Sequence, residues 1–430
     1  ELHDASGLVV LPGGIDAHVH METPMGNDIY TCDTFETGTV SAAFGGTTTI
    51  IDFAQQFHND SPKAALDRRL AAAEPQCCVD YAFHVILTDV NQASLAELPD
   101  LINIDGVSSF KLYMAYPGVL MVDDAAIFKT MRKAGEHGGM AILHAENGIV
   151  IQALIEEALE QGNTSPKFHQ LTRPQLMEGE AAHRVIRIAE LADVPTYIVH
   201  LSAQEALEAV VEARDRGIHA FAETCPHYLF LDYTKYDLPG FESAKYVMTP
   251  PLRDHKCQHA LWRGLRFDDL QLVATDHCPF CFKENPLGIL KSKQFGRDNF
   301  NKIPNGAPGV ELRLTLLYDG GVRAGKINLN RFVQLTATAP AKMFGLFPRK
   351  GTIAVGSDAD IVLFDPNQTH TISASTHHSL VDYSLFEGRE VTGRVKKVFL
   401  RGQCIVDGET WLGQAGMGRY QHRAASGRVL

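Results

Sequence analysis

The stretch GGIDAHVH at residues 13–20 decides how the rest of the chain is interpreted. It follows an apolar run, LVVLP at residues 8–12, which predicts a β-strand. His18 and His20 stand two positions apart, and on an extended chain such side chains point to the same side. Because neutral imidazole is the commonest metal ligand in proteins, the pair predicts one half of a metal site. Such a pair also occurs in ordinary loops, so the remaining sequence has to decide between the two interpretations.

The composition limits the class of protein. The chain has 430 residues and a formal net charge of -12, which gives no electrostatic support for binding nucleic acid. No apolar run reaches the roughly 20 residues that a membrane helix needs, and we recognise no secretory signal. Eight cysteines are too few for a disulfide scaffold. We therefore expect a cytoplasmic protein that binds neither nucleic acid nor membranes.

Eight β-strand candidates alternate with segments of helical periodicity. The strand candidates are residues 8–12, 47–53, 80–87, 108–114, 140–144, 195–200, 217–222 and 270–275. Helical spacing of apolar residues is clear at 125–133, 179–192 and 203–213. Alternation predicts a parallel sheet, and eight repeats predict an α/β fold of the closed (β/α)8 TIM-barrel type. The alternative, an open doubly wound sheet, would call for a GxGxxG loop after the first strand, and that spacing is absent there.

Residues able to bind metals lie at the ends of five of these strands. Active sites of barrel enzymes lie at the carboxyl ends of the strands, so these side chains are expected to meet. They are His18 and His20 after the first strand, Lys111 in the fourth, His144 after the fifth, His200 after the sixth and Asp276 after the eighth. Any one of them could be an ordinary core or rim residue. Six at equivalent positions predict a metal centre.

Lys111 needs a separate explanation, because an ammonium would be repelled by a neighbouring metal ion. Burial lowers the pKa of a lysine, and a neutral amine can react with carbon dioxide to give a carbamate. That group is an anionic ligand with two oxygens, able to bridge two metals. The alternative is a lysine whose charged end reaches the rim of the barrel.

The chain is predicted to divide into a barrel at residues 13–345 and a small β domain at 346–412. Residues 1–12 are expected to be a remnant of the small domain that leads into the first barrel strand, and 413–430 a C-terminal arm. Two helical stretches, 309–325 and 329–344, precede the small domain. There, residues 351–364 predict a turn between two strands, and 395–406 predict a second strand pair that turns near Arg401.

The motifs at these positions also resemble a known family. The chain is similar to the cyclic amidohydrolases, and most closely to bacterial D-hydantoinases and dihydropyrimidinases. The motifs that carry the resemblance include PGGIDAHVH at 12–20, GGTTTIIDF at 45–53, SSFKLYMAY at 108–116, HAENG at 144–148, YIVHLS at 197–202, ETCPHYLFLD at 223–232, YVMTPPLR at 246–253, ATDHCPF at 274–280, IPNGAPGVE at 303–311 and KGTIAVGSDADIVLFDP at 350–366. The resemblance implies a barrel joined to a small β-sandwich domain, whose N-terminal strands are missing from this chain.

The resemblance also implies a binuclear zinc centre, with Mn2+ or Co2+ as alternative metals. His18, His20 and Asp276 would hold the first ion, His144 and His200 the second, and a carboxylated Lys111 would bridge them. Tyr116 matches the tyrosine that contacts the scissile carbonyl. Thr249 and Asn305 match positions whose backbone groups hold the amide and imide of the ring. The family usually has serine where this chain has Thr249. Little effect on substrate binding is expected, because the backbone of this residue, and not its side chain, would contact the ring.

The chemistry implied is hydrolytic opening of a hydantoin or dihydropyrimidine ring to an N-carbamoyl amino acid. A hydroxide that bridges the metals would attack the ring carbonyl, because metal binding lowers the pKa of water to about 7. Asp276 would take the proton and pass it to the leaving nitrogen, and Tyr116 would stabilise the oxyanion. Alternatives are an allantoinase or dihydroorotase activity, and a non-catalytic scaffold, which the complete ligand set disfavours.

Substrate choice is expected to come from the loops at 21–30 and 55–59. Their apolar members Met21, Met25 and Phe57 could shape a pocket for a ring substituent, or could be ordinary loop packing. The D preference and a homotetramer are implied by the resemblance alone.

Overall fold

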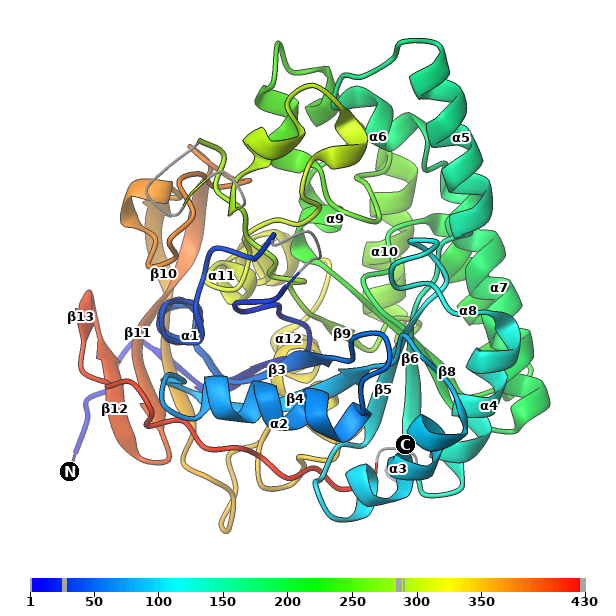
Figure 1. Ribbon diagram of the computed structural model, residues 1–430. Helices are drawn as coiled ribbons and strands as arrows, with labels where there is room; N and C mark the ends of the chain where they lie inside the picture. The colour runs from blue at the N-terminus through cyan, green and yellow to red at the C-terminus, as the bar shows by residue number, and fades with distance from the viewer. Residues whose placement is uncertain (1, 25–28, 284–287, 289–290, 426–430) are drawn as a thin grey trace.

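The computed structural model describes residues 2–24, 29–283, 288 and 291–425 of the chain. An eight-stranded parallel barrel is surrounded by helices, and a separate five-stranded antiparallel sheet lies at one side (Figure 1). The predicted (β/α)8 barrel is confirmed. In this part of the chain, no helix is both long and apolar enough to cross a membrane.

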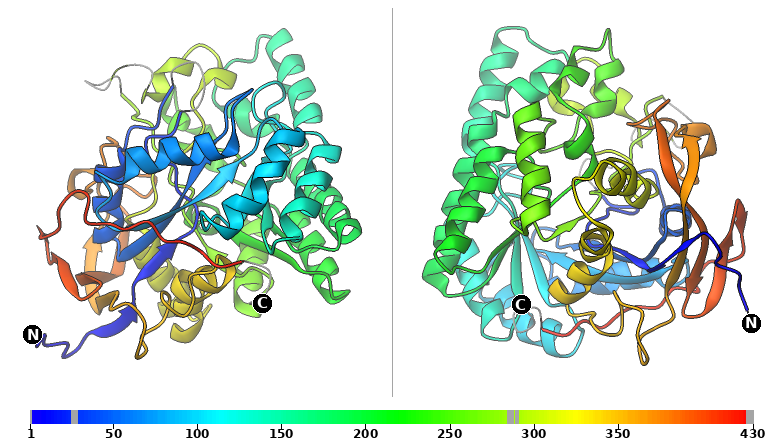
Figure 2. Two further views of the ribbon diagram at one scale, coloured as in Figure 1. Left: turned by 60° about the horizontal axis from the view of Figure 1, so that its bottom comes forward. Right: turned by 180° about the vertical axis from the view of Figure 1, so that it is seen from behind.

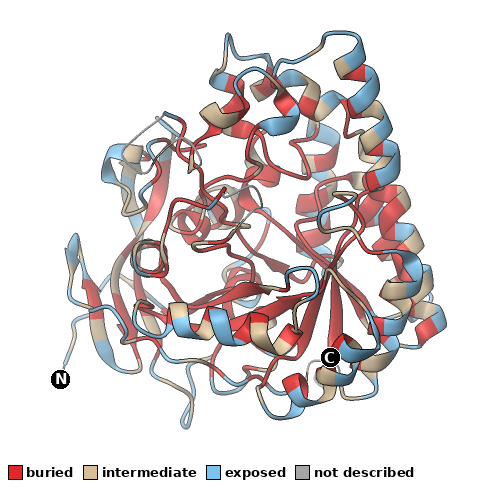
Figure 3. Ribbon diagram, in the orientation of Figure 1, coloured by how far each residue is buried: buried red, intermediate tan, exposed pale blue. Residues whose placement is uncertain are grey.

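The barrel strands follow one another in chain order, each parallel to the next. They are β2 (Gly14–Asp16), β3 (Thr47–Gln55), β4 (Asp80–Ile86), β5 (Ser109–Tyr113), β6 (Met140–His144), β7 (Thr196–Ile198), β8 (Ala220–Thr224) and β9 (Leu272–Val273). Nearly all of their residues are buried, as expected when helices cover one face and the barrel interior fills the other (Figure 3). The barrel is therefore a packed core, within which a few polar residues such as Asp52, His84 and Lys111 are also buried.

The helices cover the outside of the barrel, with one face buried against it and the other exposed to solvent (Figure 3). They are α1 (Phe35–Phe44), α2 (Pro62–Ala73), α3 (Gln92–Asn103), α4 (Asp124–Gly135), α5 (Gly148–Glu160), α6 (Lys167–Leu171), α7 (Gln175–Ala192), α8 (Gln204–Asp215), α9 (Pro226–Phe230), α10 (His255–Phe267), α11 (Arg313–Leu317), α12 (Leu329–Val333) and α13 (Ala339–Met343). Short 3-10 or π-helical segments are η1 (Tyr233–Asp237), η2 (Glu242–Tyr246), η4 (Lys293–Gly296), η5 (Phe300–Lys302), η6 (Tyr318–Arg323), η7 (Gln334–Thr338) and η8 (Ala374–Thr376). Side chains such as Thr34, Ser61 and Asp123 cap the helices that follow them.

The small sheet lies beside the barrel and has the strand order β1-β10-β11-β12-β13 (Figure 2). Its strands are β1 (Val9–Pro12), β10 (Ile361–Thr371), β11 (Glu390–Leu400), β12 (Gln403–Asp407) and β13 (Thr410–Trp411). The turn predicted near Arg401 is confirmed, with φ angles of 48° at Arg401 and 83° at Gly402.

Two predictions about strands are wrong. Residues 8–12 form an edge strand of the small sheet rather than the first barrel strand, which is β2. Only Leu11 is buried in β1, which suits a sheet edge, whereas all of β2 is buried. The segment 351–364 contains one strand, β10, and residues 351–360 form turns and bends. Lys350 fixes this segment beneath the barrel, because its buried ammonium contacts Asp358 at 3.0 Å and Asp360 at 2.7 Å.

The segment 413–425 runs as an arm along the amino ends of the barrel strands (Figure 2). The amide of Gln421 donates to the Tyr81 carbonyl at 2.8 Å, and Tyr81 donates in turn to Arg419 at 3.1 Å. Arg423 is buried and donates to the Phe83 carbonyl at 2.5 Å. The arm is thus part of the wall that closes the barrel opposite its carboxyl end.

Side chains close the barrel between its last and first strands. The Thr275 hydroxyl and amide donate to the Asp16 carboxylate at 2.7 and 3.1 Å. Arg313 is fully buried, and one guanidinium nitrogen donates to the carbonyls of Ile15 at 2.6 Å and Val273 at 3.0 Å. Because β9 has only two residues, these side-chain contacts take the place of a regular ladder of backbone hydrogen bonds between the last and first strands. We call this junction the seam of the barrel.

Replacing Arg313 with methionine should destabilise the fold. Arg313→Met removes the donor to two strand carbonyls and the buried cation beside the Asp16 carboxylate, so we expect the free energy of unfolding to fall by about 3–5 kcal/mol. Equilibrium urea unfolding measures this. The control Arg323→Met removes an exposed pair with Asp319 and should cost less than about 1 kcal/mol. Similar values for the two variants would contradict a structural role for the seam.

Candidate metal centre and active-site cavity

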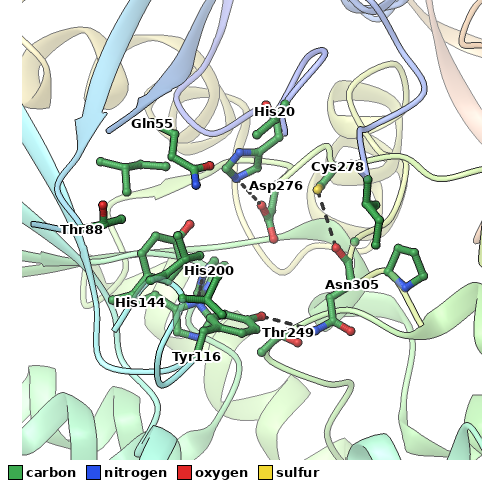
Figure 4. Close-up of a pocket in the computed structure, with 18 of the residues that line it drawn as sticks. His20, Gln55, Thr88, Tyr116, His144, His200, Thr249, Asp276, Cys278 and Asn305 are labelled. Atoms are coloured by element: carbon green, nitrogen blue, oxygen red, sulfur yellow. Dashed lines mark hydrogen bonds and ion pairs between the residues drawn. The ribbon is translucent and has the colours of Figure 1, made fainter. Parts of the chain in front are cut away.

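A cavity of about 480 Å³ opens at the carboxyl end of the barrel. Eight of the nine residues predicted for the site line it, and the ninth, Lys111, is buried on β5. The eight are His18, His20, Tyr116, His144, His200, Thr249, Asp276 and Asn305. In Figure 4 the labelled imidazoles, the Asp276 carboxylate and the Tyr116 phenol point into one space. The barrel therefore brings together residues that are up to 287 positions apart in the sequence (18 to 305).

His18, His20 and Asp276 form a compact group of three ligand atoms. The two Nε2 atoms lie 3.2 Å apart, and they lie 3.2 and 3.3 Å from Asp276 Oδ1. Ligand atoms at ~2.0–2.1 Å from a tetrahedral metal ion are separated by about 3.3 Å. The spacing and the mixture of imidazole and carboxylate therefore fit a divalent ion, and these three residues form a group able to hold one.

His144 and His200 form a second pair beside the first group. His144 Nδ1 lies 3.0 Å from His200 Nε2, and the His18 and His200 rings lie 5.4 Å apart between centroids. Both histidines are buried. Two neighbouring groups of imidazoles, each with a ring nitrogen free to bind, match the predicted arrangement for two ions.

Lys111 is a buried lysine close to both groups, since it lies near Asp276 of the first and His200 of the second. Its side chain has no exposed surface, and its Nζ has no hydrogen-bond partner in the described part of the chain. Burial lowers the pKa of Lys111 to about 7, with opposing contributions from Asp276 and Glu223. A substantial fraction of neutral amine at neutral pH is what reaction with carbon dioxide needs. The residue thus fits the predicted carboxylation and argues against a lysine that reaches the rim.

The backbone is strained where three of the predicted residues enter the cavity. Tyr116, His200 and Asp276 have φ angles of 63°, 38° and 48°, in the left-handed region that side-chain-bearing residues rarely adopt. Each follows the end of a barrel strand, so the unusual conformation turns its side chain from the barrel wall toward the cavity. Strain of this kind is typical of functional sites.

Two buried carboxylates behind the histidines were not predicted from the sequence. Glu223 accepts from His18 Nδ1 at 2.5 Å and from the Tyr197 hydroxyl at 2.7 Å. Glu146 accepts from His144 Nε2 at 2.7 Å. Because a carboxylate accepts the proton of one ring nitrogen, the other nitrogen keeps its lone pair for a metal. A sequence signal existed, since Glu223 interrupts the apolar strand AFAET and Glu146 stands two residues after His144.

The Asp276 carboxyl is held in its charged form. Burial alone would raise the pKa of Asp276, but His18, His20 and Lys111 outweigh burial and keep the pKa well below its usual range. A carboxylate that stays deprotonated at neutral pH is available both as a ligand and as a proton acceptor.

Tyr116, Thr249 and Asn305 lie on one side of the cavity (Figure 4). Burial raises the pKa of Tyr116 to about 12, so its phenol keeps its proton at neutral pH and can donate a hydrogen bond. The Asn305 amide nitrogen lies 3.5 Å from the phenol oxygen, and the Asn305 carbonyl lies 3.7 Å from the Cys278 thiol. This wall presents polar groups to whatever occupies the cavity.

The outer part of the cavity combines apolar side chains with polar ones such as His58 and Lys302, and it only partly matches the predicted loops. Phe57 lines it, as expected, but Met21 is buried beneath α1 against Gly38. Met25 lies outside the described residues. The sequence did not point to Leu120 or Phe295, which the fold brings to the same rim.

Comparisons with known proteins agree with this geometry. The sequence profile of the amidohydrolase family matches residues 9–405. The chain is 52% identical to a D-hydantoinase of Streptomyces coelicolor over 98% of this chain and 88% of the relative. It is 45% identical to a D-hydantoinase of Geobacillus stearothermophilus over 100% of this chain and 90% of the relative. The chain belongs to the amidohydrolase family.

The amidohydrolase also superposes on solved structures over almost its whole length. A crystal structure of dihydropyrimidinase from Brevibacillus agri matches with a TM-score of 0.97 at 48% identity, covering 100% of this chain and 91% of the other. An L-hydantoinase from Arthrobacter aurescens matches with a TM-score of 0.85 at 29% identity, covering 97% and 89%. The resemblance inferred from the motifs is confirmed, and the protein is a hydrolase of the cyclic amide type.

The carboxylate behind His18 should control metal affinity in this amidohydrolase. Glu223→Gln keeps the shape but exchanges an acceptor oxygen for an amide, which disturbs the orientation and basicity of the imidazole. We expect metal affinity to fall about 10–100-fold, measured by competition with a chelator and by metal content. Glu212→Gln on the exposed face of α8 is the control. Unchanged affinity in Glu223→Gln would show that His18 is oriented without this contact.

Proposed function

We propose that this amidohydrolase opens hydantoin or dihydropyrimidine rings and releases N-carbamoyl amino acids. The observation that carries the proposal is the cavity itself, where two groups of metal-binding side chains around a buried lysine face the Tyr116 phenol. The names of the relatives, D-hydantoinase and dihydropyrimidinase, support the same ring classes.

We propose that two Zn2+ ions, or Mn2+ or Co2+ in their place, bind in the cavity. His18, His20 and Asp276 would hold one ion, and His144 and His200 the other. Lys111, carboxylated on Nζ, would bridge them. Bound ions supply a hydroxide nucleophile at neutral pH and polarise the carbonyl under attack.

The remaining steps belong to side chains and backbone of this chain. Asp276 accepts the proton of the nucleophile and returns it to the ring nitrogen as the carbon–nitrogen bond breaks. Tyr116 donates a hydrogen bond to the oxygen that gains charge. Backbone groups of Thr249 and Asn305 hold the amide and imide of the ring, which orients its carbonyl for attack.

The lining of the cavity favours these rings over the alternatives. Allantoin and dihydroorotate carry additional polar or charged groups, and a carboxylate is typically bound by arginine. No arginine lines the cavity among the residues that the structure describes, and the rim is apolar around Phe57 and Leu120. We infer that the rim accepts an apolar substituent.

Higher identity to D-hydantoinases than to the L-hydantoinase supports a D preference. A homotetramer and a cytoplasmic location stay predictions.

Ring opening by the purified protein tests the substrate class. With zinc and bicarbonate supplied, we expect hydantoin and dihydrouracil to be opened and allantoin to be left intact, because allantoin shares the ring amide and imide but carries a polar ureido group that would meet the apolar side chains of Phe57 and Leu120. Release of the carbamoyl product is followed by chromatography. Preferential opening of allantoin would overturn the assignment. No opening of any ring, with two zinc ions bound per chain, would mean that the metal centre is correct and the substrate class wrong.

Replacing Lys111 tests the bridging ligand. Lys111→Ala removes the proposed bridge, so we expect the metal content to fall from two ions to one or none. We expect turnover to fall by at least about 1,000-fold, because charge stabilisation by a metal pair contributes several kcal/mol. Metal content is read by mass spectrometry and turnover with hydantoin. Lys133→Ala, on the exposed side of α4, is the control. Survival of both turnover and metal content in Lys111→Ala would rule out the bridging role.

A further inference from the structure

A second fully buried lysine lies beside the cavity and has no role in the proposed chemistry. Lys293 begins the short segment η4 and has no exposed surface. Its Nζ donates to the backbone carbonyls of Val247 at 2.7 Å, Pro304 at 2.6 Å and Gly306 at 2.7 Å. An ammonium has three protons and carbonyls only accept, so the three contacts use every donor of the group.

This arrangement is costly, which suggests that it serves a purpose. Within the described residues no ion pair joins Lys293 to a carboxylate. Burial lowers its pKa, whereas three carbonyls that can only accept favour the protonated form. Burying a charge without a counter-ion is unfavourable unless its hydrogen bonds are fully satisfied. A methionine of similar length would fill the same space without that cost. We therefore look for the role of Lys293 in the three backbone carbonyls that its Nζ binds, because packing alone does not explain a lysine at this position.

The three carbonyls belong to the two loops that form the polar wall. Val247 lies two residues before Thr249, while Pro304 and Gly306 are the immediate neighbours of Asn305. The loops also bind each other, since the Gly306 amide donates to the Val247 carbonyl at 3.1 Å. The ammonium thus fixes the distance between the two loops that face Tyr116.

The backbone of Lys293 is itself anchored to the strand end that carries Asp276. Its amide donates to the Cys281 carbonyl at 2.8 Å, and the Cys281 amide donates to Lys291 at 2.8 Å. On the other side, the Cys278 amide donates to the Ala307 carbonyl at 3.0 Å. The lysine therefore ties the loops of the polar wall to the segment that leaves the metal centre.

We propose that Lys293 is a positioning residue whose ammonium holds the loops at 247–249 and 304–306 in register with the metal centre, so that their backbone groups fit a cyclic amide. The inference rests on the proposed function of Thr249 and Asn305. It assigns Lys293 a role in ring binding and none in holding metal.

Lys293→Met tests this inference through a split between binding and turnover. We expect KM for hydantoin to rise at least about 10-fold while kcat changes less than about 3-fold, because backbone contacts to the ring act in both the ground state and the transition state. Metal content should stay equal to that of the unchanged protein. Lys293→Arg keeps a positive charge and several donors, so its KM should lie between those of the unchanged protein and Lys293→Met. It replaces Lys293→Met in the test if that variant does not fold.

Lys350→Met is the matched control, because Lys350 is equally buried but contacts Asp80, Asp358 and Asp360 at the amino end of the barrel. It should lower the melting temperature without raising KM. An unchanged KM in Lys293→Met and Lys293→Arg, or an equal rise in KM in Lys350→Met, would overturn the inference.

Hydrogen exchange separates this inference from the proposed function. In Lys293→Met the Gly306 amide should lose protection, because the Val247 carbonyl that accepts from it is no longer held. That readout needs no substrate. If the unchanged protein opens no ring, the proposed function fails, and exchange still decides whether the lysine holds the loops. Unchanged protection at Gly306 would mean that it does not.

Discussion

Closure of the barrel between its last and first strands is the constraint on which the rest of the structure depends. His18 and His20 follow β2, and Asp276 follows β9, so their ligand atoms come within 3.3 Å only if those two strands are brought together. The contact of Thr275 with Asp16 and the buried guanidinium of Arg313 perform that closure. Stability and the metal centre therefore share one seam, and the fold cannot lose its closure without losing the first group of ligands.

In the metal centre at the carboxyl end of the barrel, the arrangement of charged side chains follows from their burial. A group of imidazoles, a carboxylate and a lysine in an apolar barrel would be unfavourable unless each charge found a partner. Glu223 and Glu146 supply partners on the side of the histidines that faces the protein, and leave the other side free for cations. Lys111 has no hydrogen-bond partner within the described residues, and its lowered pKa is the physical basis for the modification proposed there. The site is built for added positive charge.

The cavity has two parts that differ in chemical character. One wall carries Tyr116, Thr249 and Asn305, and the loops of the latter two contact the Lys293 ammonium through their backbone carbonyls. The rim includes the apolar side chains Phe57 and Leu120. In the proposed function, backbone groups would bind the amide and imide that cyclic amides have in common, whereas side chains at the rim could differ with the ring substituent. This division separates recognition of the reaction centre from recognition of the rest of the substrate.

The sequence by itself determined the barrel, its approximate strands and the metal-binding residues, because hydrophobic periodicity marks the strands and polar residues at strand ends must gather at one edge of a parallel sheet. Tyr116, Thr249 and Asn305 were found only through the resemblance of their motifs to a family. The sequence supported two assignments for residues 8–12, a barrel strand and a remnant of the small domain, and could not decide between them, since an apolar run looks alike in both sheets until its partner strand is known. It also missed Glu223, Arg313 and Lys293, whose partners are distant in sequence. The separation is 205 positions between Glu223 and His18, 298 between Arg313 and Ile15, and 46 between Lys293 and Val247. Only the tertiary structure decided which buried charge faces which group, because such contacts depend on distance in space and leave no periodic pattern along the chain.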